Sequence, residues 1–135
     1  MTIFVCVDEQ GGILFNRRRI SSDREVIADI MKSIGDTALF MRDYSSKLFP
    51  ADDRICVTDN YLEAAGIGDA LFLEDAIPDD LLKRAKKVVV YHWNRLYPSD
   101  VKFPLAQFCN WARLESSVEF KGYSHERIIR EVYVL

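Results

Sequence analysis

Apolar and polar residues alternate along this chain in a pattern that predicts an α/β fold. The first apolar run, residues 3–7, has five consecutive residues rich in β-branched types. It is too short for a helix with one apolar face and suits a strand that is covered on both sides. A polar turn that contains Gly11 and Gly12 ends it. Such a strand is expected in the middle of a sheet, where a ligand would meet its carboxyl end.

A helix is predicted next, from residue 22 to residue 34. Ser22 and Glu25 have the spacing of a capping box, in which the serine caps an amide and the glutamate reaches back. Gly35 fits the carboxyl end of this helix. The apolar face at helical spacing consists of Val26, Ile27, Ile30, Met31 and Ile34.

The remaining apolar runs predict further strands separated by short helices or turns. Strands are expected over residues 37–41, 54–57, 69–73 and 88–93. Short helices or turns are expected at 42–49 and 58–65, and a helix begins with Pro78 at its first position. This alternation implies right-handed crossovers and a mostly parallel sheet. Residues 108–120 and 127–135 favour strands with no helix pattern between them, which predicts an antiparallel carboxyl-terminal hairpin.

Composition narrows the class of protein. The 135 residues are 49% hydrophobic and 29% charged, enough for the core of a single domain spanning residues 1–135. The net charge of −3 provides no general attraction for nucleic acid, so a nucleic-acid partner is not expected. No apolar run is long enough for a membrane span. Cys6, Cys56 and Cys109 are expected to be reduced, mostly buried thiols of a cytoplasmic protein. Two isolated histidines offer no metal-site spacing.

Several segments, taken in order, resemble the dihydrofolate reductase family. Residues 5–13 read Val-Cys-Val-Asp-Glu-Gln-Gly-Gly-Ile and are similar to the family's opening Val-Ala-Val-Asp-Glu-Asn-Gly-Val-Ile. Residues 39–46, 82–92 and 100–104 are similar to the segments that follow, the last through Asp-x-x-Phe-Pro. The resemblance implies a mostly parallel central sheet flanked by helices, with an antiparallel carboxyl-terminal hairpin. For a functional member it also implies the cofactor NADPH.

The departures from the family concern the cofactor. Where the family carries Gly-Gly-Gly, whose bare amides approach the cofactor pyrophosphate, this chain reads Leu73-Glu74-Asp75. The family's Gly-Arg pair is replaced by Arg42 and Asp43, although Ser45 can stand for the phosphate-binding threonine. The chain is also shorter than typical members. These differences predict that no NADPH is bound; a reductase that keeps NADPH in an altered geometry is the alternative.

The resemblance also points to a candidate ligand pocket. Cys6, Asp23 and Tyr91 fall where the family contacts its pterin, Tyr91 replacing a threonine that helps to hold the acid, and Ile27 belongs with this set. Asp23 is the candidate catalytic residue, since a carboxylate in a cleft can bind an amidine edge or manage a proton. Its simpler interpretation is favourable charge at a helix start. Cys6 and Tyr91 can equally be packed core residues.

A second candidate site is basic. A possible anion site comprises Arg17, Arg18, Arg19, Arg42 and Ser45. The alternative is that residues 15–19 form a solvated loop. Residues 93–98 mix Trp, Tyr and Arg, which is typical either of a recognition surface or of a bulky loop packed on the sheet.

Three functions follow from these observations. The first is a non-catalytic protein that binds an unknown small molecule or protein partner, with a homodimer possible. The second is a diverged NAD(P)H-dependent reductase acting on a pterin-like or other heteroaromatic substrate. The third is RNA processing, because the chain resembles small bacterial proteins that are sometimes labelled ribonuclease Z. That activity needs a zinc-binding His-x-His-x-Asp-His cluster, which two isolated histidines cannot provide.

Overall fold

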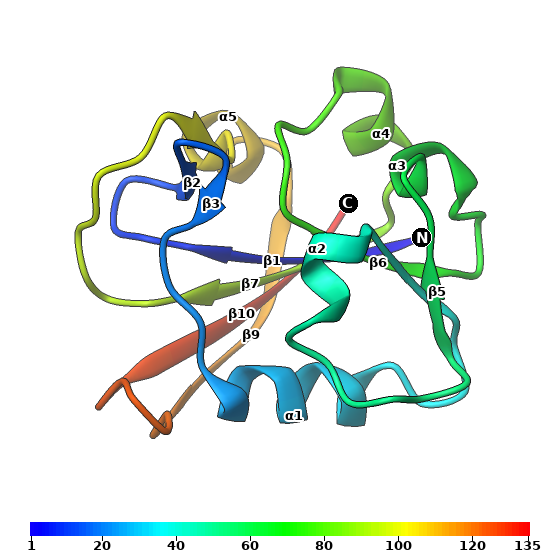
Figure 1. The fold of residues 1–135 in the computed structure, drawn as a ribbon. Helices are drawn as coiled ribbons and strands as arrows, with labels where there is room; N and C mark the ends of the chain where they lie inside the picture. The colour runs from blue at the N-terminus through cyan, green and yellow to red at the C-terminus, as the bar shows by residue number, and fades with distance from the viewer.

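The first strand lies at the centre of a seven-stranded sheet in the computed structural model, which describes all residues from 1 to 135 (Figure 1). β1 (Thr2–Val7) pairs in parallel with β6 (Ala70–Leu73) and β7 (Lys87–His92). The strand order is β5-β4-β6-β1-β7-β10-β9. The outer strands are β4 (Leu39–Met41), β5 (Ile55–Val57), β9 (Arg113–Phe120) and β10 (Ile128–Val134). Only β9 and β10 run antiparallel to their neighbours, which confirms the predicted mostly parallel sheet with a closing hairpin.

The sheet is covered on both faces, as the unbroken apolar run of β1 predicts. Helix α1 (Arg24–Ser33) packs on one face, where Phe4 joins Ile30 and other α1 side chains in the core. On the other face Ile3 and Val5 join a second core cluster. Figure 1 shows α3 (Tyr61–Ala64), α4 (Asp79–Arg84) and α5 (Leu105–Cys109) on that side, while α2 (Asp43–Ser46) lies near the sheet edge.

Asp23, not Ser22, caps α1. The Asp23 carboxylate accepts a hydrogen bond from the Glu25 backbone N–H at 2.9 Å, and Asp23 has extended backbone angles. The Ser22 side chain makes no capping hydrogen bond, so the predicted capping box is wrong by one residue. At the other end, Gly35 has a φ of +57°, the left-handed conformation that suits glycine after a helix. Similarly, Pro78 is the N-cap of α4 rather than its first helical residue.

A second, three-stranded sheet forms where a loop was expected. It consists of β2 (Gly12–Phe15), β3 (Arg18–Arg19) and β8 (Val101–Lys102). The β2–β3 turn is made by Asn16 and Arg17, both with positive φ. Two such residues form a tight hairpin turn, a connection that the basic composition of this segment concealed. Residues 15–19 are therefore a hairpin, not a simple loop.

Phe108 belongs to a helix rather than to the predicted strand. The apolar residues Phe108 and Trp111 have helical spacing, and β9 begins only at Arg113. Phe108 is fully buried, with its ring 5.6 Å from that of Phe103 and 5.1 Å from that of Tyr133. Phe108 therefore packs α5 against one face of the sheet.

The cysteines are less buried than expected. All three are free thiols; Cys6 and Cys56 are half-buried and Cys109 is exposed. No three histidine, cysteine or acidic side chains converge in an arrangement that could hold a metal ion. None of the helices has the length and apolar character needed to cross a bilayer.

The packing of Phe108 makes a testable prediction. Phe108→Ala should lower the free energy of unfolding by about 3–5 kcal/mol, because it leaves a cavity among aromatic rings. The control is Trp111→Ala, at a side chain that is 52% exposed and should cost much less. Urea unfolding followed by circular dichroism measures both. Equal losses for the two variants would contradict the central role of Phe108.

Candidate functional site

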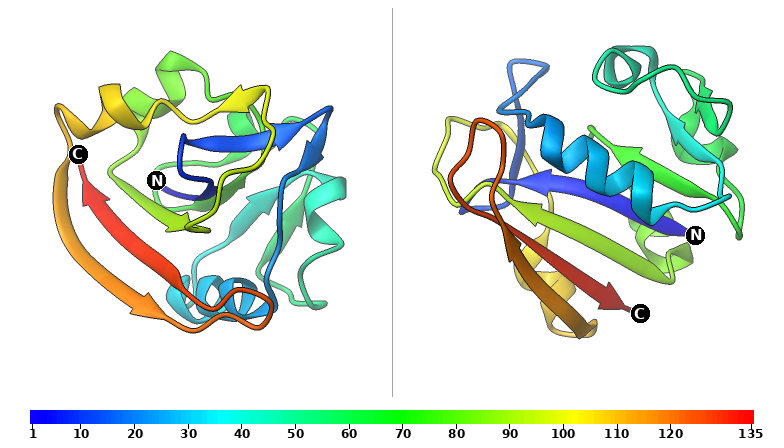
Figure 2. Two further views of the ribbon diagram at one scale, coloured as in Figure 1. Left: turned by 90° about the vertical axis from the view of Figure 1, so that its left-hand side faces the viewer. Right: turned by 90° about the horizontal axis from the view of Figure 1, so that it is seen from below.

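The Asp23 carboxylate is buried at the start of α1, where it binds the tip of the β9–β10 hairpin. Besides the Glu25 N–H, it accepts hydrogen bonds from the backbone N–H groups of Tyr123, Ser124 and His125, at 2.9, 2.8 and 3.2 Å. Figure 2 shows this tip beside α1, although it is about 100 residues away in the chain. One carboxylate therefore connects the first helix to the last hairpin.

Gly122 allows this approach. A Cβ atom at residue 122 would lie 2.6 Å from Asp23 Oδ2 and 2.8 Å from the His125 carbonyl oxygen. Burial alone would raise the pKa of Asp23, but the hydrogen bonds from the hairpin tip and from His125 lower that pKa well below its usual range. Asp23 is thus a stable carboxylate whose acceptor sites are taken by the protein.

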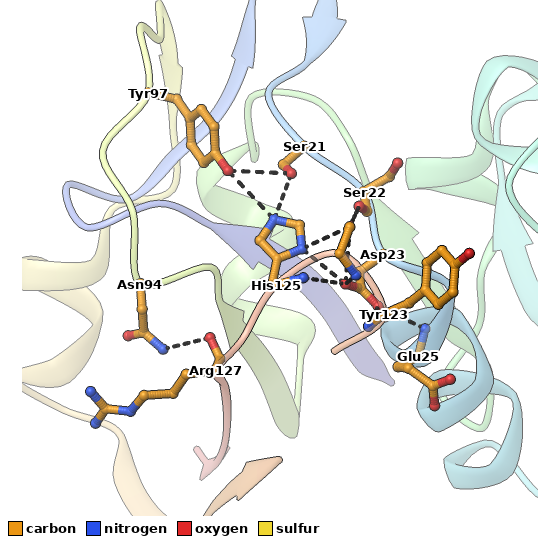
Figure 3. Close-up of polar contacts among 10 residues, drawn as sticks. Ser21, Ser22, Asp23, Glu25, Asn94, Tyr97, Tyr123, His125 and Arg127 are labelled. Carbon is orange, nitrogen blue, oxygen red and sulfur yellow. Dashed lines mark hydrogen bonds and ion pairs between the residues drawn. The ribbon is translucent and has the colours of Figure 1, made fainter. Parts of the chain in front are cut away.

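His125 links Asp23 to Ser21. Its Nδ1 lies 2.9 Å from Asp23 Oδ2, and its Nε2 lies 2.8 Å from Ser21 Oγ (Figure 3). The Tyr97 hydroxyl is 3.4 Å from the same Nε2. The ring is 96% buried and stacks on Trp93, with centroids 4.6 Å apart. Packing and hydrogen bonds together hold the imidazole in one orientation.

The network assigns the tautomer of the neutral His125 ring. A carboxylate can only accept hydrogen bonds, so Nδ1 carries the proton that is donated to Asp23. Nε2 is then the unprotonated nitrogen, and it accepts the hydroxyl hydrogen of Ser21. The three side chains form a directed chain from serine to histidine to aspartate.

Asp8 positions Tyr97 beside this chain. Asp8 is fully buried after β1; its Oδ1 accepts the Gly12 N–H at 2.7 Å and its Oδ2 accepts the Tyr97 N–H at 3.1 Å. A Cβ atom at Gly12 would lie 2.9 Å from Asp8 Oδ1, so glycine is needed there. The turn after the first strand therefore sets the place of the tyrosine.

A second polar cluster, centred on Glu74, lies at the carboxyl end of β6. Arg19 makes two hydrogen bonds of 2.9 Å to the Glu74 carboxylate, and Ser45 Oγ donates a third at 2.6 Å. Arg42 Nη2 donates to the Glu74 carbonyl oxygen at 2.9 Å. The Arg19 guanidinium also lies over the Tyr44 ring, 4.1 Å from its centroid. Glu74 is buried, and these bonds satisfy its charge.

Asp75 extends the Glu74 cluster. The Tyr61 hydroxyl donates to Asp75 Oδ2 at 2.7 Å and accepts the Glu74 N–H at 3.2 Å. Burial, with a smaller contribution from Asp75, raises the pKa of Tyr61 far above its usual value. Arg42 Nε lies 3.7 Å from Asp75 Oδ2. The polar groups at the end of β6 are thus hydrogen-bonded or ion-paired with other groups of the protein.

Little space remains between the two clusters. A cavity of about 10 Å³ lies there, too small for a ligand, and its walls include Cys6, Arg19, Ser21, Glu74 and Trp93. An open groove of about 320 Å³ lies beside it, lined by Phe15, Asn16, Arg18, Arg19, Ile20, Tyr97 and Pro98. Arg19 lines both the cavity and the groove, and the Tyr97 hydroxyl at the groove lies 3.5 Å from Ser21 Oγ.

The architecture matches a known enzyme fold. Over 98% of this chain and 94% of the other, the structure superposes on a dihydrofolate reductase from Enterococcus faecalis complexed with NADP(H) and RAB-propyl, with a TM-score of 0.68. The fold is that of dihydrofolate reductase. Sequence identity is only 10%, so the likeness concerns the fold alone. No family model matches the chain, and neither does any curated protein.

Within this dihydrofolate reductase-like fold, Tyr91 does not hold Asp23 as the resemblance implied. Its hydroxyl donates instead to Asp29 Oδ2 at 2.7 Å, and Arg130 Nη1 binds the same carboxylate at 2.8 and 2.9 Å. Burial raises the pKa of Tyr91 far above its usual value, with Asp29 adding to the effect. The longer tyrosine side chain thus binds a carboxylate in the middle of α1 and not the one at its start.

The other predicted pocket residues are mainly parts of the core. Ile27 packs in the α1 cluster, and burial raises the pKa of the half-buried Cys6 thiol well above its usual value. Asp23 has no free acceptor pair for an amidine edge, because six donors from the protein already reach its two oxygens. Ligand binding by these residues stays a prediction.

The predicted anion site is only partly assembled. Arg19, Arg42 and Ser45 converge, but on Glu74 rather than on open space. Arg17 and Arg18 are exposed on the β2–β3 hairpin, and neither makes a hydrogen bond to Glu74. The fold thus brings three of the five residues together around Glu74, whose carboxylate is an anion of the protein itself.

Three residues of the serine network were missed by sequence reasoning. Ser21 comes from the segment between β3 and α1, Tyr97 from the loop after β7, and His125 from the hairpin tip. No spacing motif connects them, because they are separated by 76 residues or more between Ser21 and the others. Trp93 and Tyr97, expected either on a recognition surface or in a packed loop, pack against His125.

The low pKa of Asp23 predicts how stability depends on pH. Stability from this carboxylate is present above its unfolded pKa of about 3.9 and is lost as the pH falls toward the lower folded value. Asp23→Asn should therefore lower stability at neutral pH and flatten the acid limb of the stability curve. Asp52, whose pKa Arg54 lowers to about 2, titrates in both proteins.

Urea unfolding at a series of acidic pH values measures that slope. The control is Asp53→Asn, which removes an exposed carboxylate that makes no side-chain hydrogen bond and should keep the wild-type curve. An acid limb in Asp23→Asn as steep as in the wild type would contradict the prediction.

Proposed function

We propose that this protein has a dihydrofolate reductase-like fold but is not a dinucleotide-dependent reductase, and that it binds a small molecule in the groove beside Tyr97. The observation that carries the proposal is the pairing of Glu74 with Arg19 and Ser45 at the end of β6. By the resemblance described above, this is where the family receives the cofactor pyrophosphate.

The Glu74 pairing opposes dinucleotide binding for two physical reasons. A buried carboxylate repels a phosphate, and the arginines that would attract the phosphate already neutralise Glu74 and bind its carbonyl oxygen. Breaking a buried pair by withdrawing one partner costs about 3–5 kcal/mol, because it leaves an uncompensated charge. A dinucleotide would have to meet this cost before making any contact of its own.

The groove beside Tyr97 favours a small ligand with an anionic group. Arg18 is exposed at its edge, and Phe15, which is 48% exposed, adds an apolar surface. Its volume of about 320 Å³ lies at the lower end of the range for small-molecule sites. A protein partner or a second copy of the chain stays a prediction. The diverged reductase remains the alternative, and nothing in the geometry favours it.

Cofactor binding tests the proposal directly. Titration with NADPH, followed by its fluorescence, should show no saturable signal, and purified protein should not turn over dihydrofolate. A bacterial dihydrofolate reductase handled in parallel is the positive control. Saturable NADPH binding coupled to substrate reduction would establish the reductase alternative instead.

The role of Glu74 as an internal anion makes a separate prediction. Glu74→Gln should lower the free energy of unfolding by about 3–5 kcal/mol, because Arg19 is left without its buried partner. Inorganic phosphate should then raise the melting temperature of this variant by several degrees, since it replaces the missing charge, and leave the wild type unchanged. Glu63→Gln, at an exposed glutamate, is the matched control. No phosphate effect in Glu74→Gln would contradict the internal-anion account.

A further inference from the structure

We propose that Ser21 is an activated nucleophile, with His125 as its general base and Asp23 as the group that orients the base, and that this site hydrolyses small carboxylic esters. The inference goes beyond the proposed function and does not depend on whether a dinucleotide binds. It is carried by the directed chain from Ser21 Oγ through His125 to Asp23.

The geometry meets the requirements for nucleophilic catalysis. Ser21 Oγ and His125 Nε2 are 2.8 Å apart, and Nδ1 of the same ring is 2.9 Å from Asp23 Oδ2. Both distances are within hydrogen-bond reach for a nucleophile, its base and the residue that orients the base. Such constellations are recognised by geometry and role rather than by position in the sequence.

The hairpin does not need Ser21 in order to close. Three backbone N–H groups of residues 123–125 already attach the tip to Asp23, and Trp93 stacks on the His125 ring. At the open end of the chain, the Ser21 hydroxyl adds its bond to His125 Nε2 and a longer one of 3.5 Å that it accepts from the Tyr97 hydroxyl. Unlike His125, which is buried, Ser21 is half-buried, so part of this residue is accessible from outside the protein.

One hydrogen-bond donor lies close to the reacting oxygen, and a second belongs to a side chain that lines the same cavity as Ser21. The Tyr97 hydroxyl is 3.5 Å from Ser21 Oγ and can donate to an oxyanion formed on a carbonyl attached there. Trp93 Nε1 is buried without a partner, and the indole forms part of the wall of the small cavity that Ser21 also lines. A buried N–H without an acceptor is costly, and the cavity of about 10 Å³ has room for no more than a single substrate oxygen that could accept from it.

The proposed reaction balances with water as the second reactant. Ser21 Oγ attacks the ester carbonyl carbon while its proton passes to His125 Nε2. The tetrahedral intermediate then breaks its bond to the alcohol oxygen, which takes the proton from Nε2 and leaves an acyl-Ser21. Water attacks the acyl carbon, His125 accepts the water proton and returns it to Ser21, and the acid is released. The ester and water give the acid and the alcohol.

A fluorophosphonate probe tests the nucleophile without knowledge of the natural substrate. Intact-mass spectrometry should show one adduct per chain, and peptide mapping should place it on Ser21. Ser21→Ala should abolish the adduct, whereas Ser22→Ala, at the exposed neighbour whose side chain makes no hydrogen bond, should label like the wild type. Initial hydrolysis of p-nitrophenyl acetate should fall by roughly 10³-fold in Ser21→Ala and in His125→Gln.

Thermal unfolding separates this role from a structural one. Ser21→Ala loses the hydrogen bond to His125 and the long one from Tyr97, and should keep a melting temperature within a few degrees of the wild type, so its loss of labelling is chemical. A known serine hydrolase is the positive control for labelling. The proposal would be overturned if the probe labelled this control but not the wild type. It would also be overturned if Ser21→Ala were labelled as strongly as the wild type, or if the adduct lay on another residue. The NADPH titration and the labelling experiment measure different properties. The proposal about ligand binding and the proposal about Ser21 can therefore be refuted independently.

Discussion

The buried Asp23 carboxylate is the interaction on which the rest of this structure depends. It caps α1, holds the backbone of residues 123–125 and orients His125. A carboxylate can be buried at this depth only because so many donors compensate its lost hydration. The hairpin tip therefore packs over the start of the helix, and this packing places His125 beside Ser21.

Glu74, at the end of β6, is a second buried carboxylate whose charge is compensated by donors from the protein. There Arg19, Arg42 and Ser45 bind an anion that belongs to the chain itself. Between Ser21, which belongs to the Asp23 network, and Glu74 only a cavity of about 10 Å³ remains. The dihydrofolate reductase-like framework is kept, while the polar groups at its strand ends bind one another and leave a separate, shallower groove beside Tyr97.

Local pattern was sufficient for most of the fold and insufficient for the site. The apolar run of β1 and the helical spacing in α1 identify buried elements, because burial imposes those periods on the sequence. The α5 helix was missed because Phe108 and Trp111 precede a strand without a turn signal. The serine network was missed for a deeper reason: Ser21 and His125 are 104 residues apart, and only the closed hairpin makes them neighbours. Asp23 was selected from a family resemblance, but its partners in this chain are different.

Nitrogen NMR of the histidine rings tests the central claim most directly, because the chain has only two histidines and His92→Gln assigns them. In mildly alkaline solution the account predicts that His125 carries its proton on Nδ1, with a strongly downfield N–H resonance, and that Nε2 is unprotonated. Asp23→Asn should weaken this preference. A proton on Nε2, or a rapidly averaging ring like that of an exposed histidine, would contradict the account.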